Sequence, residues 1–261
     1  MRTALAILTC IISASPAFAS DVVNIYSFRQ PFLIQPILTD FTKQTGIKTN
    51  VVFAKKGLIE RVKREGKHSK ADLVLTSNFS ALIQLEDLNL TQSIKSDRIK
   101  NNIPASYRDS DGQWVALTKR VRNVYSSKER LGALPELTYE DLANPQYKGQ
   151  ICTRSGKHPY NLGLVASMIA HHGEAKTKTW LEGVKANLAR KPQGNDRAQV
   201  KAVKEGLCNL ALGNSYYLGK MLQDDEQKAW AESVYINFPN QQNRGSHINV
   251  SGAVITKYAK N

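Results

Sequence analysis

The chain has 261 residues, with 36 Lys and Arg against 22 Asp and Glu, and a formal net charge of +14 at pH 7. This length suits one large domain or two smaller lobes. The positive charge is compatible with anionic partners, but the lysines are scattered, and neither an RNA-binding aromatic signature nor zinc-finger spacing occurs. We therefore expect most of the charge to be solvated surface, and we expect no nucleic-acid partner.

The first residues are typical of a secretory signal peptide, predicted over residues 1–19. Arg2 precedes the apolar run 4–12, and a small-residue cleavage site follows at 17–19. We expect cleavage after Ala19. No later stretch approaches about 18 apolar residues, so the mature protein is predicted to be exported without a membrane anchor.

Removal of the signal peptide leaves two cysteines, Cys152 and Cys208. An even pair in an oxidising compartment suggests a disulfide, which would stabilise the fold by about 4 kcal/mol in the chain-entropy model. The alternative is two reduced, buried cysteines, since each begins an apolar strand in which Cys packs well. The residues alone leave both possibilities open.

The first part of the mature chain alternates strand and helix patterns. Strands are predicted at 22–27, 47–53 and 71–75, and helices at 32–45, 58–65 and 79–88. Gly46 and Gly66 end the first two helices. Such alternation predicts a parallel sheet with crossover helices.

The second part begins with a long extended segment and then repeats the alternation. The predicted elements are the extended segment 114–125, a short helix from Tyr139, a strand at 150–154, helices at 162–172, 177–189 and 196–205, a strand at 210–212, and a final extended segment at 248–256. This order predicts two α/β lobes joined by two long strands. The N-terminal lobe would comprise 20–118 and 248–261, and the C-terminal lobe 119–247.

Two adjacent tyrosines follow the most apolar strand of the second part. The run Leu210-Ala211-Leu212 stops at Gly213-Asn214, and Tyr216 and Tyr217 come just before a helical pattern resumes. The carboxyl ends of strands are where ligands bind in open α/β sheets. The two phenols form either a stacking surface or a pair of hard oxygen ligands. The alternative is that both merely pack the start of a helix.

The mature chain resembles the periplasmic ferric-iron-binding proteins, the substrate-binding subunits of Fe(III) ABC importers, in their tyrosine-cluster branch. The matching segments include NIYSFRQ, FTKQTGIK, LTKRVRNVYS, YEDLANPQYKGQI, ARKPQGNDRAQVKAVKEG and GNSYYLGK. The resemblance implies an α/β fold of the type II periplasmic-binding-protein class, with two lobes joined by two crossing strands. It also implies a periplasmic, monomeric protein that binds iron in an interlobe cleft and delivers it to an inner-membrane ABC permease and its ATPase.

The resemblance assigns three phenolate ligands for Fe(III), namely Tyr216, Tyr217 and, in the turn HPYN, Tyr160. This assignment is chemically sensible because Fe(III) is a small, hard cation that prefers anionic oxygen. Removing a proton from a phenol of pKa about 10 costs roughly 4 kcal/mol at pH 7, which direct bonding to a trivalent cation can supply.

The resemblance also implies a synergistic anion, such as carbonate. Some family members supply a histidine and a glutamate from the first lobe, but the matching positions here hold Gln30 and Ser77. The sequence is therefore similar to the branch in which an anion fills the remaining coordination positions. Arg29, Gln30 and Arg120 would hold that anion, since a guanidinium grips an oxyanion with two parallel hydrogen bonds.

Several alternatives remain open. Family members usually continue past the returning strand with further helices, and these C-terminal helices are missing after Asn261, so we expect a truncated chain or a fragment. The chain could instead bind a different small anion or a cationic solute such as a polyamine, or be an exported basic interaction protein. An enzyme is not expected, because no Ser/His/Asp or Cys/His constellation emerges from the sequence.

Overall fold

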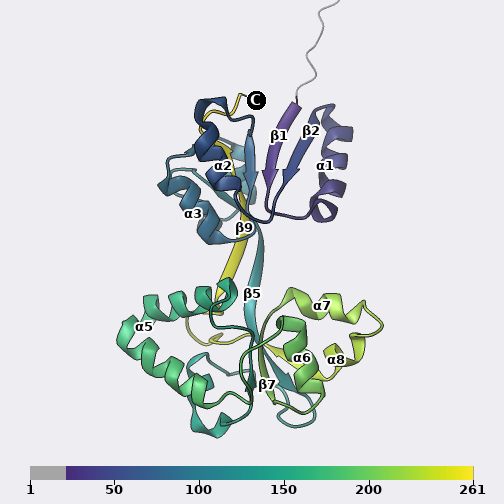
Figure 1. Cartoon of the computed structure of the whole chain (residues 1–261), viewed down its shortest axis with the longest axis vertical. Coiled ribbons are helices and arrows are strands. Elements are labelled where there is room, and N and C mark those ends of the chain that lie inside the picture. Colours follow the sequence, from purple (N-terminus) through teal and green to yellow (C-terminus); the bar gives the residue numbers. More distant parts are fainter. Residues whose placement is uncertain (1–21, 261) are drawn as a thin grey trace, which may run out of the picture. The chain divides into compact units, whose positions relative to one another are not determined.

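The computed structural model describes residues 22–260 of the chain (Figure 1). The predicted signal peptide and its cleavage site at Ala19 lie outside the described residues. Within the described part of the chain, no helix combines the length and the apolar character needed to cross a membrane.

The described chain divides into two compact units, and the two long strands β5 (Val115–Ser127) and β9 (Ile248–Thr256) contribute residues to both. Unit 1 comprises 22–77, 81–115 and 253–260, and unit 2 comprises 78–80 and 116–252.

Unit 1 is a mostly parallel sheet with helices between its strands (Figure 1). Besides the end of β9, its elements are β1 (Val22–Ser27), α1 (Pro31–Thr45), β2 (Lys48–Phe53), α2 (Leu58–Glu65), β3 (Leu73–Leu75), α3 (Phe79–Asp87), β4 (Thr91–Gln92) and α4 (Asp97–Asn102), with short 3-10 turns at Gly66–His68 and Ala105–Tyr107. The strands follow the order β2-β1-β3-β9. β1 is parallel to β2 and β3, whereas β9 returns antiparallel to β3 and β4.

The alternation predicted for this region is confirmed, and only part of the apolar surface of α1 is buried. Ile34 packs into the core with Ile25 and Leu75, whereas Phe32 and Ile37 are 64% and 69% exposed. α1 packs against the edge strand β2, so a narrow stripe of the helix is enough to cover it.

Unit 2 has three layers, with a mixed sheet between helices (Figure 1). Besides β5 and part of β9, its elements are β6 (Ile151–Cys152), α5 (Pro159–Ala186), α6 (Asp196–Lys204), β7 (Leu210–Asn214), α7 (Tyr216–Leu222), α8 (Lys228–Glu232) and β8 (Val234–Asn237), with 3-10 turns at Glu140–Ala143 and Pro145–Tyr147. β6 is parallel to β7, and β5 is antiparallel to both β7 and β8.

Successive side chains on the strands of unit 2 point to opposite faces of the sheet, because a strand has a period of two residues, and they pack in two different hydrophobic clusters. Val124 and Leu212 pack in the cluster that contains α5 residues, whereas Tyr125 and Ala211 pack in the cluster that contains α6 and α7 residues. This second cluster also contains a disulfide between Cys152 and Cys208. The sheet is thus covered on both faces, which explains why β7 reads as a continuous apolar run.

Two predicted boundaries in unit 2 differ from the structure. The predicted helices at 162–172 and 177–189 correspond to one element, α5, which ends at Ala186 and which Gly173 interrupts with a left-handed φ of 78°. The strand predicted at 150–154 shortens to Ile151–Cys152. Beyond it, the carbonyls of Arg154 and Ser155 accept hydrogen bonds from the side chain of Asn161 rather than from a neighbouring strand.

A carboxylate at the start of a 3-10 turn joins α5 to the loop before β9. Glu140 accepts hydrogen bonds from Asn240 Nδ2 at 2.9 Å and from Arg244, and it contacts His172 Nε2 at 2.6 Å. Burial raises the pKa of Glu140, but hydrogen bonds from Asn240, its own backbone, Arg244 and His172 outweigh it and lower the pKa to about 2.

Because the pKa of Glu140 lies below its ordinary value of 4.5, its ionised form stabilises the fold above that value, and the contribution is lost as the pH falls toward 2. We expect Glu140→Gln to lower the thermal midpoint most at pH 6 and progressively less toward pH 3, measured by circular dichroism. Glu232→Gln, at an exposed position on α8, should show no such trend. A difference between wild type and Glu140→Gln that stays constant with pH would contradict this role.

Candidate metal centre

The three predicted tyrosine ligands all lie in unit 2, at helix starts that follow two parallel strands. Tyr160 is the second residue of α5, and Tyr216 and Tyr217 are the first two residues of α7. The preceding strands β6 and β7 are parallel neighbours, so their carboxyl ends meet at one edge of the sheet. His158 caps α5, and its Nδ1 accepts from the backbone N–H of Tyr160 at 3.2 Å.

The structure brings the three phenols together. The hydroxyl oxygens of Tyr160 and Tyr216 are 3.4 Å apart, and the ring centroids of Tyr216 and Tyr217 are 4.2 Å apart. Tyr216 is 37% exposed, so solvent reaches the cluster. Such a group of oxygens could hold a hard cation.

The phenols of Tyr216 and Tyr217 are protonated in the absence of a cation. Burial raises the pKa of Tyr216, and its hydrogen bonds with Tyr160 and Tyr217 raise it further. Burial also raises the pKa of Tyr217. A metal ion would therefore have to displace protons from these oxygens, which favours ions of high charge.

Two guanidinium groups lie close to the ring of Tyr160. The Cζ of Arg120 is 5.3 Å from the ring centroid, and the Cζ of Arg154 is 5.1 Å from it. Both distances are within the range of a cation–π interaction. Arg120 is one of the three predicted anion ligands, whereas Arg29 and Gln30 belong to unit 1, where Gln30 directly precedes α1 and makes no side-chain capping hydrogen bond.

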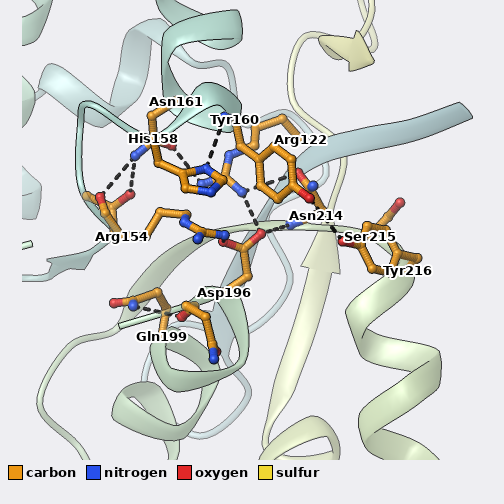
Figure 2. Close-up of polar contacts among 12 residues, drawn as sticks. Arg122, Arg154, His158, Tyr160, Asn161, Asp196, Gln199, Asn214, Ser215 and Tyr216 are labelled. Carbon is orange, nitrogen blue, oxygen red and sulfur yellow. Dashed lines mark hydrogen bonds and ion pairs between the residues drawn. The ribbon is translucent and has the colours of Figure 1, made fainter. Parts of the chain in front are cut away.

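A buried ion pair connects the two segments that carry the tyrosines (Figure 2). Asp196 is the first residue of α6, and its Oδ2 accepts from Arg122 Nη1 at 2.8 Å and from the backbone N–H of Asn214 at 2.9 Å. Its Oδ1 accepts from Arg154 Nη1 at 3.2 Å. The Asp196 side chain is 0% exposed and that of Arg122 is 2% exposed.

Arg122, the cationic member of the pair, contacts the two segments that carry the tyrosines. It donates to Asn161 Oδ1 at 2.7 Å and to Asn214 Oδ1 at 3.2 Å. Asn161 directly follows Tyr160, and Asn214 lies two residues before Tyr216. The pair therefore contacts residues beside both groups of tyrosines: Arg122 binds the side chains of Asn161 and Asn214, and Asp196 binds the backbone N–H of Asn214.

The end of β7 is held from a second direction by Tyr125. The hydroxyl of Tyr125 donates to the carbonyl oxygen of Asn214 at 2.9 Å. A Cβ atom at Gly213 would lie 2.5 Å from the Tyr125 ring, so only glycine allows this close approach. The glycine in GNSYY is thus required for the packing that positions the tyrosines.

A small cavity of about 10 Å³ adjoins Tyr160, with room for about one water molecule. It is lined by Arg120, Arg122, Tyr160, Asn214, His247 and Asn249. Burial, together with the charges of Arg122 and Arg120, lowers the pKa of His247 to about 4. His247 is therefore neutral at pH 7 and adds no further positive charge.

Sequence reasoning missed three residues of this site, namely Arg122, Arg154 and Asp196. Arg122 lies two positions after Arg120 in an extended segment, a spacing that places both on one face. Asp196 resembles an ordinary acidic residue in the first turn of a helix. Among residues 22–260, no group of three or more His, Cys, Asp or Glu side chains could hold a metal ion.

The comparisons with known proteins fit this arrangement. Residues 68–260 match the family model described as bacterial extracellular solute-binding protein. The chain belongs to this family. It is 41% identical over 242 residues to iron uptake protein A1 of Synechocystis sp., covering 92% of this chain and 67% of that protein. It is 28% identical to the major ferric iron-binding protein of Neisseria meningitidis serogroup A, covering 95% and 74%.

Solved structures give the same result for the fold of this solute-binding protein. Ferric iron-binding protein A of Mannheimia haemolytica, in an open conformation, aligns with a TM-score of 0.86 at 55% identity, covering 92% of this chain and 76% of that one. A Trichodesmium protein in complex with iron and citrate ligands aligns with a TM-score of 0.85 at 39% identity, covering 92% and 77%. The type II periplasmic-binding fold is thereby confirmed. These relatives are binding and uptake proteins, so the chain is not an enzyme.

The Arg122–Asp196 pair is expected to be essential for the stability of unit 2. Asp196→Ala leaves a buried guanidinium without its carboxylate, a change that typically costs about 3–5 kcal/mol. We expect a loss of that size in the free energy of unfolding, measured by urea denaturation. Asp225→Ala, at an exposed position, should stay within about 0.5 kcal/mol of wild type. Equal losses in the two variants would contradict the role of the pair.

Proposed function

We propose that this protein is a periplasmic solute-binding protein that binds Fe(III) through the phenolates of Tyr160, Tyr216 and Tyr217. The observation that carries the proposal is the convergence of the three phenols, with the Tyr160 and Tyr216 oxygens 3.4 Å apart. The ferric-binding and iron-uptake names of its relatives support the same ion.

The chemistry of the donor set selects a hard, highly charged cation. Each phenol of ordinary pKa costs about 4 kcal/mol to deprotonate at pH 7, and burial increases this cost for Tyr216 and Tyr217. A trivalent ion gains more from three anionic oxygens than a divalent ion does, and so offsets the cost better. Divalent ions would additionally prefer imidazole or carboxylate ligands, and no group of three or more His, Cys, Asp or Glu side chains among residues 22–260 could hold a metal ion.

The charges around the cluster support a co-bound anion. Three phenolates neutralise Fe(III), and Asp196 balances one of the nearby arginines, which leaves a surplus of positive charge among Arg120, Arg122 and Arg154. A small oxyanion such as carbonate, or a carboxylate, would compensate this surplus. The citrate in the Trichodesmium structure is an anion of this kind. Arg120 is the proposed anion ligand in unit 2, and Arg29 and Gln30 remain predicted ligands.

The family to which the chain belongs supports a role in delivering the bound ion to a transporter. Bacterial extracellular solute-binding proteins serve ABC importers, and we propose an inner-membrane permease and its ATPase as the partners of this monomeric protein. The proposed location is the periplasm, after cleavage of the signal peptide.

Removing one phenol oxygen should abolish tight iron binding without unfolding the protein. We expect Tyr160→Phe, Tyr216→Phe and Tyr217→Phe each to weaken Fe(III) binding more than about 100-fold, because even outer-shell partners of metal ligands contribute 10–100-fold. Affinity is measured by competition with citrate, following the visible phenolate-to-iron absorption. Tyr235→Phe on β8 is the matched control and should bind as wild type does. Wild-type affinity in all three variants would refute the ligand set.

Iron uptake should depend on an oxyanion. In buffer freed of bicarbonate, we expect added bicarbonate or citrate to strengthen Fe(III) binding by wild type at least about tenfold, since one charge-assisted hydrogen bond contributes about 1.5–3 kcal/mol. Arg120→Met and Arg29→Met should each lose most of this enhancement. The iron affinity is measured at matched pH with and without the anion. An affinity that the anion leaves unchanged in wild type would count against an anion site.

A further inference from the structure

We propose that Arg154 is a positioning residue for Tyr160, and that the buried carboxylate of Asp196 fixes its guanidinium beside the ring. This inference rests on the proposed iron-binding function. It goes beyond that function in assigning two effects to Arg154. The side chain holds Tyr160 in place, and its positive charge stabilises the negative charge that Tyr160 carries when it binds metal.

The geometry places Arg154 between a buried carboxylate and the ring (Figure 2). Its Nη1 lies 3.2 Å from Asp196 Oδ1, and its Cζ lies 5.1 Å from the Tyr160 ring centroid. The Arg154 side chain is 14% exposed, so little water screens either contact. The ion pair with Asp196 therefore fixes the position of the guanidinium beside the Tyr160 ring.

Asp196 fixes Arg154 firmly because its other oxygen is already occupied. Oδ2 accepts from Arg122 and from the backbone of Asn214, which leaves Oδ1 for Arg154. The backbone around Arg154 is fixed as well, because its carbonyl accepts from Asn161 Nδ2 at 3.0 Å. Backbone and side chain of Arg154 are thus both attached to the network that supports the tyrosines.

Arg154 therefore differs from Arg120, the other arginine near the ring. The guanidinium of Arg154 is committed to a fully buried carboxylate, so we assign it to the ligand and not to the anion. A fixed positive charge beside a phenolate lowers the energy of the negative charge that spreads over the ring. The interaction is stronger for the metal-bound phenolate than for the neutral phenol, and it thus favours the loaded state.

A double-mutant cycle between Arg154→Met and Tyr160→Phe tests the proposal on the full chain, with Fe(III) affinity measured by citrate competition. We expect Arg154→Met to weaken binding about 10- to 100-fold in the wild-type background. In the Tyr160→Phe background it should weaken binding less than about threefold, because the phenolate on which it acts is gone. Additive losses in the cycle would overturn the proposal.

The absorption of the iron-loaded protein provides a readout that a merely structural role would not move. Without the nearby positive charge the phenolate electrons lie higher in energy, so the visible band of Arg154→Met should shift to longer wavelength. Arg154→Lys keeps the charge and should keep the band close to its wild-type position. If the methionine variant fails to fold, Arg154→Gln, which also removes the charge, takes its place in the cycle, where its loss of affinity must likewise vanish in the Tyr160→Phe background.

The controls separate this inference from the proposed function. Arg197→Met removes an arginine of α6 whose Nη1 donates to Gln227, and it should leave both affinity and spectrum unchanged. Wild-type protein that takes up no Fe(III) would overturn both the function and the inference. Wild-type protein that binds Fe(III), together with an additive cycle, would overturn the role of Arg154 alone.

Discussion

A buried pair of opposite charges, Arg122 and Asp196, is the interaction on which the candidate site depends. Burying either charge alone would be costly, so the two must meet, and hydrogen bonds at their remaining positions lower the cost further. Most of these positions are filled by Asn161 beside Tyr160, Asn214 beside the tyrosine pair, and Arg154, whereas Nε of Arg122 has no hydrogen-bond partner among the described residues. The requirement to satisfy one ion pair thus fixes the spacing of two chain segments.

The phenols of the tyrosine cluster can be neutral without a cation and ionised when one is bound, which suits reversible binding. Before a cation arrives, the phenols of Tyr216 and Tyr217 retain their protons, because burial disfavours the phenolate. The charge of Arg154 opposes this tendency at Tyr217. Tyr216 and Tyr217 therefore carry no negative charge without a cation, and the proposed ligand set would offer three anionic oxygens to an ion strong enough to displace the protons.

The fold could be predicted largely from local patterns. Alternating strands and helices, the apolar run of β7 and the glycine at 173 each carry a local signal, and the structure has the corresponding elements. The exact extent of β6 could not be predicted, and beyond it the carbonyls of Arg154 and Ser155 bind the side chain of Asn161 rather than a neighbouring strand. The exposure of most of the apolar face of α1 was likewise a matter of tertiary packing.

The sequence by itself determined the chemistry available to this protein: three tyrosines in predicted strand-to-helix turns, arginines on an extended segment, and two cysteines after the predicted signal peptide. Only the tertiary structure decided that the hydroxyls of Tyr160 and Tyr216, 56 residues apart in the chain, approach to 3.4 Å. It also decided that Asp196 is a buried anchor rather than a solvated helix-start residue. The physical reason is that burial and partner choice depend on contacts between distant segments, which no local pattern encodes.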